Sequence, residues 1–181
     1  MLNRREFMLA LSAVGMASAA PAYTQERPRF SDPPFALGVA SGYPSQDGVV
    51  IWTRLVIDPS RPDGGIDPVR IRLNWAVARD EKMRDVVASG LEYLVPAWAH
   101  SLRVEVKGLE PDRWYWYRFT AGDNESPVGR TRTAPAPQAV ASRLRFAFAS
   151  GQHYEQGYFN AYRYMLADEL DLVAFLGNYI Y

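Results

Sequence analysis

Two short polar loops carry the residues of this sequence that are best placed to do chemistry. One is Ser150-Gly151-Gln152-His153-Tyr154, and the other is Gly177-Asn178-Tyr179-Ile180-Tyr181. Each directly follows an apolar run, and their hydroxyl, amide, imidazole and phenol groups can donate or accept hydrogen bonds or approach a metal ion. The sequence has no cysteine, so a disulfide, a thiolate metal site and a cysteine nucleophile are excluded.

Histidine is the second chemical limit, because the sequence has only His100 and His153. We expect His100 to be a surface or cross-strand residue, because it lies among predicted β-strands. His153 lies in the first of the two polar loops, which makes it a candidate for approaching a metal but does not make it a ligand.

The elements that must position these loops form a βαβ pattern. Apolar runs at 144–149 and 170–176 are predicted to be strands, and residues 157–169 between them a helix. The helical residues that share one face at this spacing are Phe159, Tyr162, Met165 and Leu166. Strands joined in this way are parallel, so their carboxyl ends meet at one edge of the sheet, where functional groups of α/β proteins gather.

The longer segment 35–132 has the pattern of a β-sandwich. It contains about seven short strand-like runs separated by turn residues, in a chain rich in aromatic residues (5 Trp, 11 Tyr, 8 Phe), which favour strands. The expected strands are 35–40, 48–54, 69–78, 86–89, 92–95, 101–106, 114–121 and 127–131. The predicted fold class is therefore mainly β, a fibronectin type III-like sandwich followed by a truncated α/β (βαβ) unit.

The run Leu109-Glu110-Pro111 ahead of Tyr115 is typical of the tyrosine corner of fibronectin-like sandwiches, in which a phenol bonds to an upstream turn. The alternative is an aromatic strand without this bond. The aromatic run 114–117 also has two interpretations, packing within or between domains and, less commonly, a platform for stacking a ligand.

The first 22 residues are predicted to be an export signal and are set apart from the fold. Paired arginines, Arg4 and Arg5, precede a mildly apolar run and then small residues suited to cleavage, as in twin-arginine signals. This predicts a periplasmic or secreted protein whose signal engages the export translocon; an uncleaved anchor or a chance arginine pair are the alternatives. Residues 23–34 and 133–141 are predicted linkers, and 142–181 the start of a second domain.

Charge excludes one class of partner. Twenty basic and twenty acidic residues cancel, and no basic stripe suited to a phosphate backbone is present, so nucleic-acid binding is not expected.

The order of these segments resembles PhoD-like alkaline phosphatases. The motifs are GVVIWTRL, VGRTRTAP, LRFAFAS, YEQGYFNAYRYM and DLVAFLGNYIY, which follow the arginine signal in that order. The resemblance implies a fibronectin-like N-terminal domain ahead of a metallophosphoesterase domain that cleaves phosphate mono- and diesters. It also implies iron and calcium as cofactors.

Two departures from the family pattern fall on metal positions. The resemblance implies an iron-binding cysteine where this chain has Gly151, and a metal-bridging aspartate where it has Asn178. Glycine has no ligand atom, and an asparagine side chain offers only a neutral carbonyl oxygen. Tyr181 matches a family tyrosine that reaches iron.

We therefore expect an N-terminal fragment that is inactive alone, binds neither iron nor calcium, and has no assignable catalytic residue. A phosphate ester would be its substrate only if a missing domain completed the site. The alternative is a non-catalytic exported β-sandwich that acts as a binding module.

The predicted βαβ unit also has a packing consequence. A single helix cannot cover both faces of two parallel strands, so Val173, Phe175 and Leu176 are expected to stay partly exposed. We expect residues 140–181 to be prone to self-association.

Overall fold

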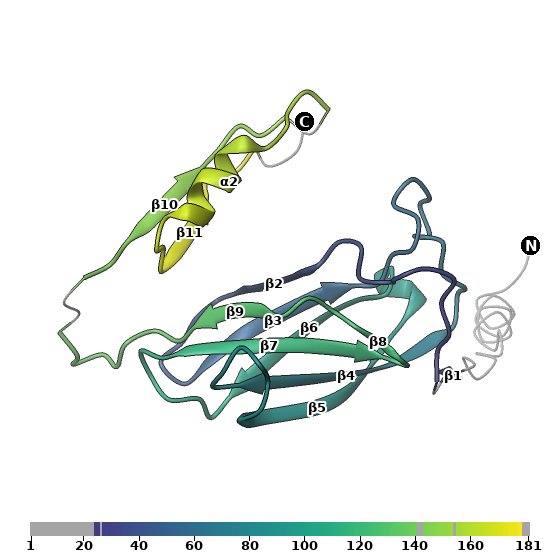
Figure 1. Ribbon diagram of the computed structural model, residues 1–181, viewed down its shortest axis with the longest axis horizontal. Helices are drawn as coiled ribbons and strands as arrows, with labels where there is room; N and C mark the ends of the chain where they lie inside the picture. The colour runs from purple at the N-terminus through teal and green to yellow at the C-terminus, as the bar shows by residue number, and fades with distance from the viewer. Residues whose placement is uncertain (1–23, 26, 141–142, 154, 179–181) are drawn as a thin grey trace, which may run out of the picture.

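The computed structural model describes residues 24–25, 27–140, 143–153 and 155–178. The predicted signal at 1–22 and Tyr181 lie outside the described residues. Within these ranges the chain forms a β-sandwich and a smaller βαβ unit (Figure 1). Helix α2 (Asn160–Ala167) spans only eight residues, and the described part of the chain contains no helix long and apolar enough to cross a membrane.

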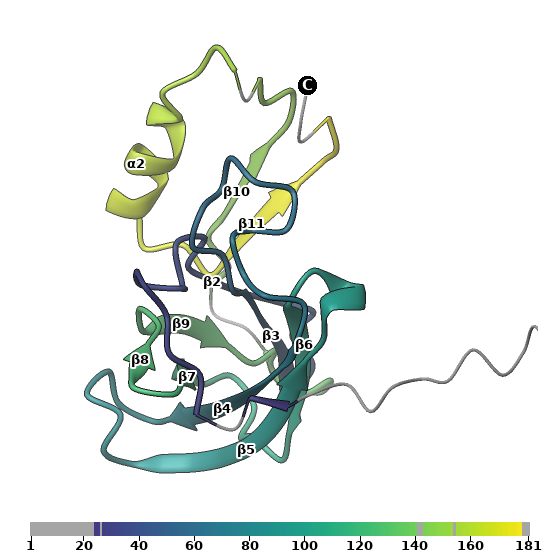
Figure 2. The same cartoon turned by 90° about the vertical axis from the view of Figure 1, so that its right-hand side faces the viewer.

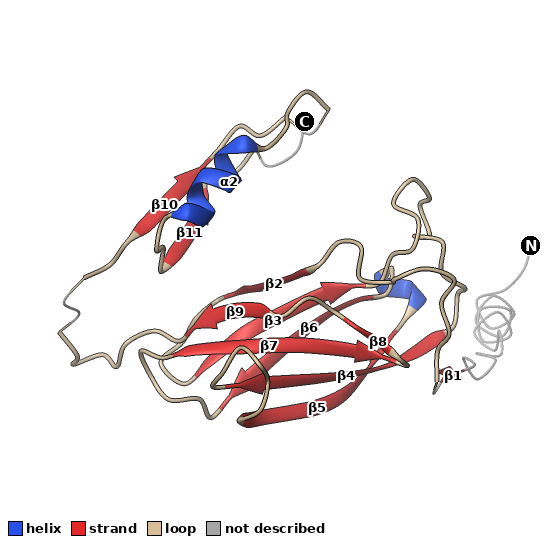
Figure 3. Cartoon of the chain, viewed as in Figure 1, coloured by secondary structure: helices blue, strands red, loops and turns tan. Residues whose placement is uncertain are grey.

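Two antiparallel sheets build a fibronectin type III-like sandwich, the fold class that the sequence predicts (Figure 3). In one sheet the order is β2–β3–β6, and in the other it is β5–β4–β7–β9. The strands of the first sheet are β2 (Val39–Gly42), β3 (Gly48–Arg54) and β6 (Ser101–Lys107). Those of the second are β4 (Arg70–Ala78), β5 (Val86–Leu94), β7 (Trp114–Ala121) and β9 (Gly129–Arg132).

Two short strands extend the second sheet. Strand β1 (Thr24–Gln25) lies within the segment predicted to be a linker and pairs in parallel with β4. Strand β8 (Asn124–Glu125) turns back on the end of β7 and was not expected from the sequence.

Alternation along the strands places the core between the sheets. In β7, Tyr115, Tyr117, Phe119 and Ala121 are buried, and the residues between them are half-buried on the outer face. Strand β4 contributes Ile71, Leu73 and Val77 to the same core. Successive side chains of a strand point to opposite faces, which is why the pattern could be read from the sequence.

Strand β5 differs from the prediction of two short strands at 86–89 and 92–95, because it is continuous through Gly90. Gly90 pairs with Trp75 of β4, and the Trp75 indole occupies the space in which a Cβ at position 90 would lie, with ring atoms 2.6–2.8 Å away. The glycine therefore accommodates a neighbouring indole and does not mark a break.

The sequence predicts His100 to be a surface or a cross-strand residue, and the surface alternative is wrong. His100 follows the short 3-10 helix η1 (Pro96–Trp98), is 3% exposed, and its Nε2 lies 2.9 Å from the carbonyl oxygen of Val69. A ring N–H that donates to a backbone carbonyl can be buried at low cost, so His100 ties the start of β6 to the segment that leads into β4.

The tyrosine corner is present. The phenol oxygen of Tyr115 accepts a hydrogen bond of 2.9 Å from the backbone N–H of Glu110, in the turn that precedes β7. This bond fixes the connection from the β6 side of the sandwich to the central strand of the other sheet.

The βαβ unit has the predicted order, with parallel strands β10 (Phe146–Ala149) and β11 (Leu172–Phe175). Figure 2 shows α2 on one side of the two strands. The rings of Phe159 and Tyr162 stack, and Tyr162 packs edge-on against Phe175.

Helix α2 is shorter than the helix predicted at 157–169. The prediction for one of the four residues on its apolar face is wrong. Leu166 is 86% exposed, whereas Tyr162 and Met165 are half-buried. Two strands lie only about 5 Å apart and cover a narrow strip, so part of the helix's apolar face extends beyond the sheet edge.

Candidate functional site

The candidate site lies where β10 and β11 end. The last paired residues are Ala149 and Phe175, and the N–H of Leu176 donates to the carbonyl of Ala149 at 2.9 Å. The two loops after the strands are joined directly, because the N–H of Gln152 donates to the carbonyl of Asn178 at 3.0 Å. The expectation that parallel strands bring the two loops together is therefore confirmed for the residues that the structure describes.

Backbone conformation shapes both loops. Gly151 has φ +69°, and Asn178 has φ 51°, in the left-handed region that glycine and asparagine tolerate best. A Cβ built on Gly151 would meet no atom within 4 Å. Position 151 thus has room for a side chain, at the conformational cost that a non-glycine residue carries at positive φ.

A hollow of about 260 Å³ opens beside the strand ends. Polar side chains from both loops and from the start of α2 contribute to its wall: Ser150, Gln152, His153, Gln156, Asn160 and Asn178. The phenol of Tyr162 donates a hydrogen bond to Oε1 of Gln152, so the helix holds the first loop at this hollow. The helical spacing predicts apolar packing for Tyr162 but not this bond, because spacing indicates a helix face and not the partner of a hydroxyl group.

The donor set of this hollow does not fit an iron or calcium centre. Gly151 provides no side-chain atom, and Asn178 provides a neutral amide in place of a carboxylate. Among the described residues, no three histidine, cysteine, aspartate or glutamate side chains gather in a way that could hold a metal ion. Tyr181 lies outside the described residues, so its predicted role remains a prediction.

Acidic charge appears at the opposite end of the strands. Asp171, just before β11, accepts a hydrogen bond of 2.9 Å from the N–H of Arg145 and pairs with the guanidinium of Arg132. The Arg145 bond, with the nearby positive charge of Arg132, lowers the pKa of Asp171. No local sequence pattern predicts the pair of Arg132 and Asp171, because the two residues are 39 positions apart. It sits at the strand starts, away from the hollow.

Family comparisons cover most of the chain in two consecutive blocks. Residues 17–135 match the family model of the PhoD-like phosphatase N-terminal domain. Residues 146–181 match the model of the PhoD-like phosphatase itself. The first match alone covers more than half of the chain.

Individual relatives give the same result. Alkaline phosphatase D of Bacillus subtilis (strain 168) is 51% identical over 154 residues, which is 85% of this chain and 26% of that protein. A solved structure of PhoD superposes with a TM-score of 0.83 at 51% identity, over 85% of this chain and 29% of that one. The chain thus spans about a quarter of the length of the curated relative that it matches.

Proposed function

This chain belongs to the PhoD-like phosphatase family, and on that premise we propose that it is the N-terminal part of a phosphate-ester hydrolase. It supplies the sandwich and the first βαβ unit of the phosphoesterase domain. One observation carries this proposal: the loops after β10 and β11 lie within the segment that matches the phosphatase model, and they are hydrogen-bonded side by side at a hollow with polar side chains in its wall.

We further propose that the 181 residues do not hydrolyse phosphate esters by themselves. Metal-dependent hydrolysis of such esters needs ions that activate water and stabilise the phosphate oxygens. Position 151 offers no ligand and position 178 no charge. Iron and calcium, the ions that the family resemblance implies, are therefore not expected to bind in this chain.

A direct assay tests this part. The purified chain is incubated with p-nitrophenyl phosphate and bis-p-nitrophenyl phosphate, with iron and calcium present, beside the B. subtilis relative as a positive control. Release of p-nitrophenol by this chain should equal that of a metal-only blank. Turnover above that of the blank would show that the chain alone is active and would contradict the proposal.

A chimera tests the assignment of the two positions. The matching quarter of the B. subtilis relative is replaced by this chain, either unchanged or with Gly151→Cys and Asn178→Asp together. We expect the unchanged chimera to be at least about tenfold less active than the intact relative, because substitution of even the supporting residues of a metal site lowers activity that much. The double substitution should restore it.

The matched control makes the same two exchanges elsewhere in the hollow, as Gly157→Cys with Asn160→Asp. Both positions line the hollow, and this pair should not restore activity. An unchanged chimera as active as the intact relative would refute the assignment of positions 151 and 178.

We also propose that the protein is exported by the twin-arginine route and acts in the periplasm or outside the cell. The support is the order of Arg4-Arg5, the apolar run and the small residues in the first 22 positions. Fusing residues 1–34 to a reporter that is active only after export tests the idea. Replacing both arginines by lysine should abolish the activity of the reporter. Reporter activity that is unchanged by this substitution would disprove the route.

A further inference from the structure

Arg132 lies where the sandwich meets the segment that leads to the βαβ unit. It is the last residue of β9, and its side chain is 26% exposed. Its Nη2 lies 2.5 Å from Oδ1 of Asp112, in the turn that contains the tyrosine corner. Its guanidinium carbon lies 5.4 Å from the centre of the Trp114 ring. The sandwich therefore holds this guanidinium in place from two sides.

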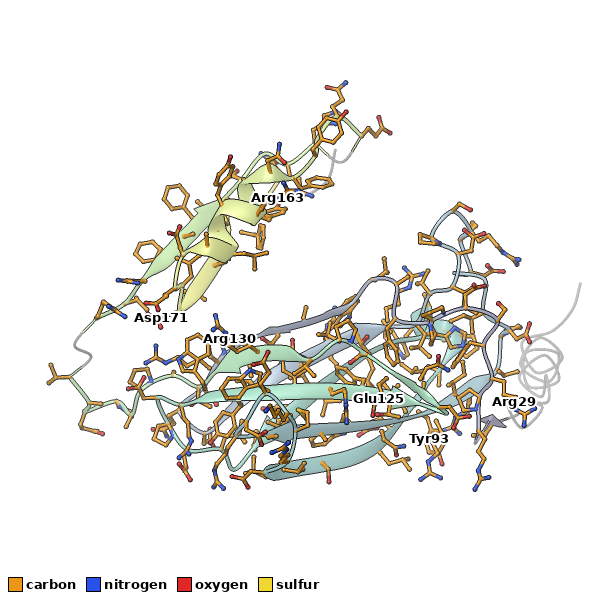
Figure 4. All side chains as sticks on the ribbon, in the orientation of Figure 1. Arg29, Tyr93, Glu125, Arg130, Arg163 and Asp171 are labelled. Carbon is orange, nitrogen blue, oxygen red and sulfur yellow. The ribbon has the colours of Figure 1, made fainter. Side chains whose placement is uncertain are left out.

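Asp171, in the βαβ unit, forms an ion pair with the same guanidinium. One carboxylate oxygen accepts from Nη1 of Arg132, and the other accepts from the N–H of Arg145 at 2.9 Å. The Asp171 N–H donates in turn to the carbonyl of Arg145 at 2.8 Å. Asp171 thus joins the starts of β10 and β11, and its side chain is only 14% exposed. Figure 4 shows Asp171 at the end of the unit that faces the sandwich.

The chain just after Arg132 is also fixed to the sandwich. Thr133 Oγ1 donates to the carbonyl of Glu110 at 2.7 Å and accepts from the N–H of Arg113 at 3.0 Å. The N–H of Ala134 donates to the carbonyl of Ser45 at 2.9 Å. The anchored part of the predicted linker therefore ends near Ala134, and the rest alone would act as a tether.

These contacts enclose a second hollow of about 260 Å³ between the two parts of the chain. Its wall includes Asp112, Arg132 and Thr133 from the sandwich side and Leu144, Asp171 and Leu172 from the βαβ side. The interface between the two parts is therefore incompletely packed. Because few apolar contacts fix their relative orientation, the ion pairs contribute much of what fixes it.

We propose that Asp112, Arg132 and Asp171 form a positioning bridge that fixes the βαβ unit on the sandwich. Arg132 suits this role because a guanidinium presents several donors in a rigid plane and can bind two carboxylates at once. An exposed ion pair contributes little, and Asp112 is 53% exposed. The Arg132–Asp171 pair, however, is largely shielded. It closes a loop whose ends the chain already holds near each other. The bridge grips the strand starts, which leaves the loops at the strand ends pointing away from the sandwich (Figure 1).

Distances between spin labels in the complete 181-residue chain test the bridge. The chain has no cysteine, so Asp123→Cys in the turn after β7 and Tyr164→Cys on α2 can be labelled without background. Both positions are exposed. Pulsed electron paramagnetic resonance then reports the distance distribution between the two parts, and no substrate or metal is needed.

We expect a single narrow distribution for the labelled parent chain. Arg132→Gln and, separately, Asp171→Asn should each convert most of it into a broad distribution. Arg130→Gln is the matched control, because Arg130 lies on the same strand as Arg132 and its guanidinium carbon lies 4.3 Å from the Trp114 ring centre. This variant should keep the narrow distribution. Circular dichroism checks that every variant retains the sandwich.

The outcomes separate the bridge from a general loss of structure. If Arg132→Gln unfolds the sandwich, the result for Asp171→Asn tests the bridge instead, because Asp171 lies outside the sandwich. A parent chain with a broad distribution, or an Asp171→Asn variant that keeps the narrow one, would overturn the proposal. Because the readout is a distance, failure of the phosphatase assignment would leave this result unaffected.

Discussion

At the scale of single residues, Tyr115 carries one specific stabilising bond. Its phenol oxygen accepts from the Glu110 N–H at 2.9 Å, and the residue is 1% exposed. Tyr115→Phe removes the acceptor and leaves a backbone N–H without its partner, so we expect the free energy of unfolding to fall by about 1 to 3 kcal/mol. Urea unfolding followed by tryptophan fluorescence measures this.

The control for this change is Tyr43→Phe, because Tyr43 is 85% exposed. It removes the same hydroxyl at the surface and should change the free energy of unfolding by no more than about 0.5 kcal/mol. Equal effects of the two substitutions would show that the tyrosine corner contributes no specific stability.

Tyr117 predicts a dependence on alkaline pH. Burial raises its pKa to about 12, partly offset by a hydrogen bond with Ser41, whereas an exposed tyrosine ionises near pH 10. The folded state holds this proton more tightly, so the stabilisation is complete below about pH 10 and is lost as the pH rises towards about 12. Stability should therefore fall through this window.

The variant Tyr117→Phe isolates this contribution. Urea unfolding of both proteins at pH 8 and pH 11 should show that the wild type loses about 1 kcal/mol more than the variant over this interval. The pH 8 comparison absorbs the constant cost of removing the hydroxyl. A parallel decline in the two proteins would contradict the raised pKa.

At the scale of elements, Gly90 tests how β5 packs on β4. A Cβ at position 90 would lie 2.6 Å from the Trp75 ring, a distance that forces the indole or the strand to move. We expect Gly90→Ala to lower the free energy of unfolding by about 1 to 3 kcal/mol, as overpacked core sites do.

Gly42 of β2 provides the matched control in the other sheet. A Cβ built there meets no atom within 4 Å, so Gly42→Ala should be neutral or slightly stabilising. Thermal unfolding of the two variants should rank Gly90→Ala well below Gly42→Ala; the reverse order would show that the indole moves aside at little cost.

At the scale of the whole molecule, the open face of the βαβ unit predicts self-association. Helix α2 packs on the face that carries Phe175, and the register of β10 and β11 places their alternate residues on the other face. Those residues are Phe146, Phe148, Leu172 and Leu176, which are 59%, 65%, 45% and 66% exposed. Contiguous apolar surface of this kind mediates association in water.

Sedimentation velocity over a range of concentrations measures this association. The wild-type chain should form larger species as its concentration rises, and Phe146→Ser with Phe148→Ser should shift it towards the monomer. The control Tyr158→Ser removes an aromatic side chain that is 93% exposed in the loop before α2, and should behave as the wild type. A wild-type chain that stays monodisperse would contradict the prediction.

The accuracy of the sequence-based predictions follows from how local each signal is. Alternation in 69–78 and 101–106 predicts β4 and β6 to within one residue of their observed bounds, because successive side chains of a strand point to opposite faces. The split of β5 at Gly90 and the inward placement of Leu166 were wrong, because each depends on a neighbour: the Trp75 indole in one case and the edge of a two-stranded sheet in the other.

The same distinction between local and long-range signals applies to the candidate site. The sequence by itself determined the strand–helix–strand order of the βαβ unit, the candidate tyrosine corner, the two loops that meet at the strand ends, and the glycine and asparagine at positions 151 and 178. These depend on residue type and short-range periodicity. Only the tertiary structure decided the burial of His100, the bond from Tyr162 to Gln152, and the bridge from Asp112 through Arg132 to Asp171. Each of these joins polar groups that are distant in sequence, and a hydrogen bond or an ion pair depends on positions in space that no local pattern records.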